Sequence, residues 1–244
     1  HGLAKAGAQV TVVHLMDRLM ERQLDSHAAA MLKKAVEARG ITVLINSETI
    51  AIIGKRRVQA VALKNGTQIE ADLVVVAAGI RSNIDLAHGA GLNVDRGIIV
   101  DDNLRASRPD IFAIGECAEH RGVCYGLVEP AYEQARILAA HLAGENAHYP
   151  GSVLATNLKV SGVNVFSAGD FIGAPGTEQL VFLDAGLGIY KKLVIAKGCL
   201  VGAVLFGDTA DGLWYVDLIR QGNSVEAIRD DIIFGRALAE RKAA

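Results

Sequence analysis

Two short stretches of the sequence place polar side chains directly after a run of apolar or β-branched residues. In the first, Val13 is followed by His14, and then by Arg18 and Arg22. In a dinucleotide-binding unit this strand end contacts the adenosine ribose, where an acid holds the two hydroxyls and a nearby arginine favours a 2′-phosphate. A neutral histidine accepts one hydrogen bond but does not match a carboxylate. Two interpretations stay open: a ribose-binding site, or a solvated loop with two incidental arginines.

The second stretch is residues 111–118, in which an apolar run ends at Gly115 and Glu116. A glycine lets the backbone approach a ligand closely. Glu116 presents a carboxylate acceptor at the carboxyl end of a strand, where open α/β sheets bind their ligands. A sugar-alcohol chain with several hydroxyls requires such an acceptor. The alternative is a strand-ending turn with an exposed glutamate.

Other kinds of catalytic site find no support in the sequence. Cys117 and Cys124 lie seven positions apart, which is neither a C-x-x-C pair nor the spacing of zinc ligands. The motifs G-x-S-x-G and H-E-x-x-H and the P-loop are absent from the sequence. We therefore predict no nucleophilic catalysis, no metal site and no catalytic acid or base.

The composition excludes several classes of protein. The chain has 244 residues, of which 51% are hydrophobic and 21% charged, and its net charge is −2. A disordered chain has fewer apolar residues, and a nucleic-acid-binding protein usually has a basic balance. No run of about 18 apolar residues is free of charges or breakers, so we predict no membrane span. The 26 glycines suit an α/β protein with many tight turns.

The order of predicted elements is that of an α/β protein with a β insertion. Asp25 is expected to cap a helix that ends near residue 39. Asn65-Gly66 is the strongest hairpin signal. Pro130 fits the first turn of a helix. The predicted strands up to residue 148 are 9–13, 41–45, 48–53, 57–63, 67–70, 72–77, 98–100 and 110–114, and the last helix of this part is 129–142.

A boundary is expected near residues 149–152. Beyond it the pattern predicts strands at 158–165, 179–184, 189–196 and 200–205, followed by helices at 213–221 and 225–233. A group of strands followed by helices is typical of an α+β domain.

The order of several motifs is more specific than any one of them. The segments 6–13, 21–25, 77–83, 97–101, 104–107 and 109–116 follow one another in an order that resembles the FAD-dependent pyridine-nucleotide oxidoreductases of the glutathione-reductase type. Within that superfamily, segments 13–25, 115–122, 125–128 and 156–162 most resemble the large subunits of NAD(P)H-dependent nitrite reductases. Rubredoxin reductases and related NADH:acceptor reductases are the near alternative.

This resemblance implies an α/β fold, a partial Rossmann-like arrangement of two dinucleotide-binding domains followed by a small α+β C-terminal domain. Residues 1–95 would form part of the NAD(P)-binding domain, residues 96–150 the C-terminal part of the FAD-binding domain, and residues 151–244 the small domain. The FAD-binding glycine fingerprint and the first nicotinamide strand are not in the sequence. We therefore expect an N-terminally truncated chain that alone holds FAD weakly or not at all and is inactive by itself.

The resemblance also implies roles for residues near FAD. Gly115 and Glu116 match the motif that contacts the ribityl chain and phosphates, where the family commonly has aspartate at the second position. Leu127 and Val128 match the turn before the helix whose N-terminus faces the flavin pyrimidine ring. Such a helix end stabilises negative charge on a reduced flavin.

A second group of residues is implied in binding the nicotinamide nucleotide. Gly79 matches the strand-end glycine beside this nucleotide. His14 occupies the position of the ribose-binding acid, and Arg18 and Arg22 follow it. These residues leave the choice between NADH and NADPH open.

The reaction implied by the resemblance is hydride transfer from NAD(P)H to FAD, followed by single-electron transfer in the cytoplasm to downstream iron–sulfur and siroheme domains or to an acceptor protein. The three cysteines cannot bind such a cluster themselves. Two alternatives remain open: a rubredoxin-reductase-like enzyme, and a non-catalytic fragment that acts as a docking or homodimerisation domain through residues 151–244.

Overall fold

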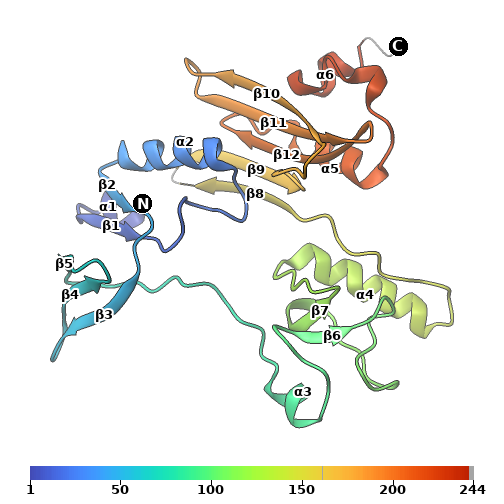
Figure 1. Cartoon of the computed structure of the whole chain (residues 1–244), viewed down its shortest axis with the longest axis horizontal. Coiled ribbons are helices and arrows are strands. Elements are labelled where there is room, and N and C mark those ends of the chain that lie inside the picture. The colour runs from blue at the N-terminus through green and yellow to red at the C-terminus, as the bar shows by residue number, and fades with distance from the viewer. Residues whose placement is uncertain (161, 242–244) are drawn as a thin grey trace. The chain divides into compact units, whose positions relative to one another are not determined.

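The computed structural model describes residues 1–160 and 162–241. The chain divides into two compact units, the first built from His1–Val75 with Ala155–Ala244 and the second from Val76–Leu154. Figure 1 labels the elements of both units. Each unit positions its own group of candidate residues.

The first unit begins with two helices and a two-stranded parallel sheet. A short helix, α1 (Gly2–Lys5), precedes strand β1 (Val10–Val13), which pairs in parallel with β2 (Ile41–Leu44). Helix α2 (Ser26–Glu37) connects them, and the Asp25 carboxylate accepts the Ala28 N–H at its start. The predicted strand–helix–strand unit and its cap are thus confirmed.

A three-stranded antiparallel meander follows, as predicted. Its strands are β3 (Thr49–Gly54), β4 (Val58–Leu63) and β5 (Gln68–Glu70). In the turn between β4 and β5, Gly66 has φ +87° and the Thr67 N–H donates to the Asn65 side-chain oxygen at 3.0 Å. Asparagine and glycine fit this turn because one supplies a local acceptor and the other tolerates positive φ.

The predicted buried strand at residues 72–77 is wrong. No residue of this run lies in a strand, and Val75 and Val76 are about 70% exposed. An apolar run becomes a buried strand only beside a neighbouring strand that takes its backbone hydrogen bonds. In the described residues the parallel sheet that contains β1 has β2 as its one other strand, so the run finds no such neighbour.

The first unit ends in a five-stranded antiparallel sheet. Its strands, β8 (Ala155–Val160), β9 (Val163–Gly169), β10 (Glu178–Asp184), β11 (Ile189–Ala196) and β12 (Cys199–Phe206), lie in the order β10-β11-β12-β9-β8. The sheet is followed by helix α5 (Gly212–Gln221), the 3₁₀ turns η2 (Glu226–Ile228) and η3 (Ile232–Phe234), and the short helix α6 (Arg236–Ala239).

The two faces of this sheet are covered by different parts of the unit. Phe166, Leu193 and Leu205 pack with Tyr215 and Ile232, which come from α5 and η3. Neighbouring strand residues point the opposite way. They form a second buried cluster with α2, which contains Leu24, Ala28, Ala29, Leu32, Val36, Ile41, Val43, Val165, Tyr190, Val204 and Phe206. The β1–α2–β2 segment and the C-terminal sheet therefore share a core, and Figure 1 shows α2 beside β9.

Two predictions for the C-terminal region are wrong in part. The strand predicted at 158–165 is divided between β8 and β9, with Gly162 at φ +80° between them, and residue 161 lies outside the described residues. The helix predicted at 225–233 is two 3₁₀ turns. Successive i→i−3 hydrogen bonds replace helical ones there, and this tighter path buries Val225 and Ile232 against the sheet.

The second unit is small and loop-rich. It contains α3 (Asp85–Gly89), the parallel strands β6 (Ile98–Val100) and β7 (Ala118–His120), the 3₁₀ turn η1 (Gly115–Cys117) and helix α4 (Val128–Leu142). The strand predicted at 110–114 is wrong, because only Phe112 makes a bridge, to Arg105. The second unit has a buried cluster that contains Val100, Leu104, Ala113, Ala118 and Tyr149.

The helices found in residues 1–160 and 162–241 are all too short or too polar to cross a membrane.

Candidate functional site

A partly buried hydrogen bond joins the turn η1 to the helix α4. The Gly115 N–H donates to Oε1 of Gln134 at 2.7 Å, and Gln134 is 1% exposed. Gly115 has φ +79°, a conformation that other residues rarely adopt. A Cβ at this position would meet only Ala131, at 3.8 Å. Gly115 is therefore required by its backbone conformation, and the space beside it is open to a ligand.

The N-terminus of α4 presents backbone donors. Among the described residues, no side chain caps this end, whose N-cap is the extended residue Leu127. Leu127 and Val128 are exposed, whereas Pro130 in the same turn is buried. The first N–H groups of a helix have no partner within it, and the helix dipole makes this end favourable for negative charge. Apolar side chains beside backbone N–H donors suit a flat aromatic ligand that carries negative charge.

Glu116 follows Gly115 in η1 and is exposed. Its backbone carbonyl accepts the Ser82 hydroxyl at 2.7 Å, which ties the segment after Gly79 to η1. Gly79 itself is exposed and has φ +85°. In this unit the structure therefore places η1, with Gly115 and Glu116, against the first turns of α4 and links the Gly79 segment to η1.

The donors and acceptors at this edge fit part of FAD. The Glu116 carboxylate is an acceptor for hydroxyl groups, and the α4 N-terminus offers N–H donors to an electron-rich ring. A Cβ at Gly115 would occupy the open space beside the backbone, through which a ligand could otherwise approach the backbone closely. These residues would hold the ribityl chain and one edge of the flavin.

His14, Arg18 and Arg22 lie in the other compact unit, on the segment between β1 and α2. The His14 ring Nε2 lies 3.2 Å from Glu21 Oε2. The Arg18 guanidinium contacts both Asp17 oxygens, at 3.0 and 3.1 Å. Arg22 is exposed. The neighbouring carboxylate of Asp17 offsets part of the charge of Arg18.

Sequence reasoning missed three residues at these positions. Glu21 supplies a carboxylate beside His14, and its signal was an acid within the segment that follows the strand. Gln134 holds Gly115, and its signal was a polar residue one helical turn after Pro130 on the buried face of α4. Ser82 had no signal, because its bond to Glu116 joins residues that lie 34 positions apart.

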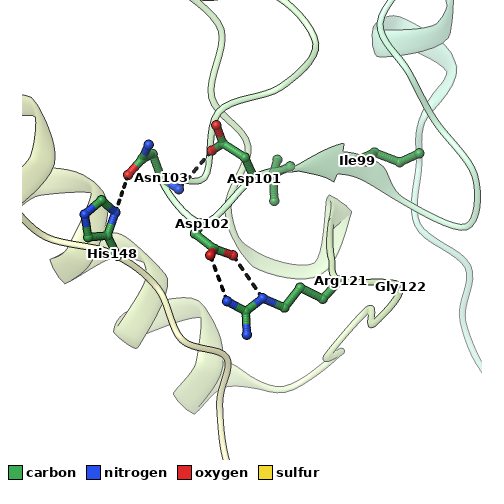
Figure 2. A pocket seen from close by; sticks show the side chains of 8 residues that line it. Ile99, Asp101, Asp102, Asn103, Arg121, Gly122 and His148 are labelled. Atoms are coloured by element: carbon green, nitrogen blue, oxygen red, sulfur yellow. Dashed lines mark hydrogen bonds and ion pairs between the residues drawn. The ribbon is translucent and has the colours of Figure 1, made fainter.

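An open pocket of about 610 Å³ lies elsewhere in the second unit (Figure 2). Its wall includes Asp102, whose carboxylate contacts Arg121 Nη2 at 2.7 Å and His120 Nε2 at 2.8 Å. The hydrogen bonds from Arg121 and His120 lower the pKa of Asp102 to about 2. On another side, His148 contacts Asn103 at 2.7 Å. The polar groups shown in Figure 2 largely bind one another. In the described part of the chain, no cluster of His, Cys, Asp or Glu is placed to hold a metal ion.

Comparison with known proteins identifies the family. The profile of the family described as "Pyridine nucleotide-disulphide oxidoreductase" matches residues 2–147. The chain belongs to the pyridine nucleotide-disulphide oxidoreductase family. The profile described as "Rubredoxin NAD+ reductase C-terminal domain" matches residues 155–223. The first match contains both groups of candidate residues, and the second covers β8 to α5.

Two curated members of the family are similar to most of this chain. "Nitrite reductase [NAD(P)H]" of Bacillus subtilis (strain 168) is 51% identical over 212 residues, which are 86% of this chain and 26% of that protein. "Assimilatory nitrate reductase electron transfer subunit" of the same organism is 40% identical over 233 residues, 95% of this chain and 30% of that protein. The chain thus spans less than a third of the length of either relative.

A solved structure of the family supports the fold. The crystal structure of a ferredoxin reductase from Rhodopseudomonas palustris superimposes with a TM-score of 0.82 at 26% identity, covering 100% of this chain and 61% of that chain. The predicted resemblance and fold class are confirmed: an α/β nucleotide-binding reductase fold followed by a small α+β domain.

Proposed function

We propose that this chain is the electron-input module of a nitrite reductase large subunit, which passes electrons from NAD(P)H through FAD to an acceptor. The observation that carries the proposal is the 51% identity to a relative named as an NAD(P)H nitrite reductase. The η1–α4 arrangement supports it, because it offers the donors and the acceptor that one part of FAD needs. The name of the second relative supports a role in nitrate assimilation.

In this proposal each group of residues has a binding role. Gly115 and Glu116 hold the ribityl chain and phosphates of FAD, and Leu127 and Val128 cover the pyrimidine edge of the ring. Bound FAD would supply the redox chemistry, exchanging a hydride with the nicotinamide and single electrons with the acceptor. The N-terminal dipole of α4 stabilises negative charge beside the ring. No side chain need donate or remove a proton for this transfer.

We propose that His14, Arg18 and Arg22 contact the nicotinamide nucleotide in the first unit, with Glu21 beside His14. Residues 1–95 then serve as NAD(P)-binding domain, residues 96–150 as the C-terminal part of the FAD-binding domain, and residues 151–244 as the small domain. We further propose that the module works in the cytoplasm, where NAD(P)H is supplied, and delivers electrons to iron–sulfur and siroheme centres of the same protein.

The test is flavin reduction and electron delivery in the full-length protein. We expect the purified protein to contain FAD, NADH or NADPH to bleach its flavin absorption under anaerobic conditions, and nitrite to reoxidise it. Absence of FAD, or a flavin that neither nucleotide reduces, would overturn the proposal and leave a docking or dimerisation role for residues 151–244.

A second candidate is an NADH:rubredoxin-type reductase. The match of residues 155–223 to a rubredoxin reductase C-terminal domain favours it. Rapid reduction of added rubredoxin together with no consumption of nitrite would select this candidate over the first.

A further inference from the structure

One buried carboxylate joins the nucleotide half of the first unit to the C-terminal sheet. Asp25 is 7% exposed and uses both oxygens. Its Oδ1 accepts the Ala28 N–H at 2.9 Å, which caps α2, and its Oδ2 accepts the Tyr190 hydroxyl at 2.7 Å. These two partners lie far apart in the sequence. The start of α2 is therefore fixed by a strand of the C-terminal sheet.

A lysine on the same strand faces the same carboxylate. Tyr190 and Lys192 are two positions apart on β11, so both lie on the face of the sheet that α2 covers. Lys192 Nζ lies 3.7 Å from Asp25 Oδ2 and donates to the Ile172 carbonyl at 3.3 Å. The ring of Tyr190 also stacks on His27, with centroids 4.6 Å apart. The carboxylate thus has a hydroxyl, an ammonium and a backbone N–H around it.

Stability alone is a weak reason for this arrangement. Lys192 is 7% exposed, and the desolvation of a buried ion pair commonly cancels its Coulombic gain, so apolar residues of similar volume would stabilise the core as well. Directional bonds to one carboxylate do what apolar packing does not: they fix where the chain enters α2. This favours a role in positioning.

The segment that enters α2 here carries the proposed nucleotide-binding residues. Leu24 is fully buried next to Asp25, and its carbonyl accepts the Arg18 side chain at 3.4 Å. Further back, Glu21 contacts His14, which follows β1. Residues 14–24 are therefore held at one end by the β1–β2 sheet and at the other by the Asp25 contacts to β11.

We propose that Tyr190 and Lys192 are positioning residues for nicotinamide-nucleotide recognition, acting through Asp25 on the segment 14–24. The inference rests on the proposed function, because it takes this segment as the nucleotide site. It assigns to the C-terminal sheet a part in the affinity for NAD(P)H, although no residue of the sheet need touch the nucleotide.

The experiment uses Tyr190→Phe in the full-length protein. This change keeps the ring and its packing and removes one hydroxyl. We expect the KM for the reducing nucleotide to rise about threefold to tenfold, which corresponds to the free energy of one hydrogen bond. We expect kcat and FAD content to change much less. Lys192→Met, which keeps the length of the side chain, should act in the same direction, and Lys192→Arg should restore part of the affinity.

Tyr215→Phe is the matched control. Tyr215 is also fully buried in the first unit, and its hydroxyl also donates to an oxygen at 2.7 Å, the Ile232 carbonyl, away from segment 14–24. We expect it to lower the unfolding midpoint and leave the KM unchanged. Equal KM changes in both tyrosine variants, or an unchanged KM in Tyr190→Phe, would overturn the inference. If wild-type protein already shows no nucleotide-dependent flavin reduction, the proposed function itself fails, which is a separate result.

Discussion

The amide N–H of Gly115 is aimed at the side-chain oxygen of Gln134, and the two atoms lie 2.7 Å apart. This bond sets the position of the η1 turn on α4, and with it the spacing between Glu116 and the α4 N-terminus. Two short motifs that the sequence places apart are thus joined through a third residue, at the edge where we propose that FAD binds.

Replacing Gln134 should damage both stability and FAD retention. In Gln134→Leu the partly buried Gly115 N–H loses its acceptor inside the unit, which costs about 0.5–1.5 kcal/mol, the net contribution of a typical hydrogen bond. We expect a lower free energy of unfolding in urea and a lower FAD content in the full-length protein. Gln59→Leu, at an exposed position on β4, serves as control and should change stability by less than about 0.5 kcal/mol. Full FAD retention in Gln134→Leu would contradict this account of the edge.

Glu116→Ala should weaken FAD binding without unfolding the protein. The carboxylate is exposed, so its removal leaves no buried group without a partner. Loss of a charge-assisted hydrogen bond of about 1.5–3 kcal/mol raises the Kd for FAD about tenfold to a hundredfold. Titration of the apoprotein with FAD measures this, with Glu145→Ala, another exposed acid, as control. An unchanged Kd would remove Glu116 from the site.

Glu21 should matter for the choice between NADH and NADPH. A carboxylate near the end of β1 can hold the ribose hydroxyls of NADH and repels a 2′-phosphate. We expect Glu21→Gln to raise the KM for NADH about threefold to tenfold and to lower the ratio of NADH to NADPH efficiency. Steady-state rates with both nucleotides test it, and Glu37→Gln on the exposed side of α2 is the control. A ratio that does not move would leave His14 and the arginines as the selective groups.

The ion pair of Asp102 should make stability depend on pH in the acid range. The hydrogen bonds from Arg121 and His120 lower the pKa of Asp102 from 3.8 to about 2. A lowered folded-state pKa stabilises the fold above pH 3.8, and this contribution disappears as the pH falls through about 2. At about pH 6.5 we therefore expect the free energy of unfolding of Asp102→Asn to be lower than that of wild type. At about pH 3 we expect this difference in free energy to be smaller.

Urea unfolding at the two pH values measures the Asp102 effect, and Asp110→Asn, at an exposed position, provides the comparison. A difference between Asp102→Asn and wild type that stays constant or grows as the pH falls would show that the carboxylate contributes nothing through its charge.

Local patterns were enough for the parts of the fold in which neighbours in sequence are also neighbours in space. The sequence predicts Asp25 as a helix cap and Asn65-Gly66 as a turn, because their hydrogen bonds reach only two or three residues along the chain. The order of the motifs indicates the same family as the profile match to residues 2–147.

The sequence predicts the family, the positions of the candidate residues and most local elements, but not the absence of strands at 72–77 and 110–114. The tertiary structure shows that Gln134 binds Gly115 and that Tyr190 binds the cap of α2, contacts that join residues 19 and 165 positions apart and therefore have no local pattern. It also decided that residues 72–77 stay outside any strand. Apolar residues there favour burial, but burial in a sheet needs a neighbouring strand to pair with, and pairing depends on the whole chain.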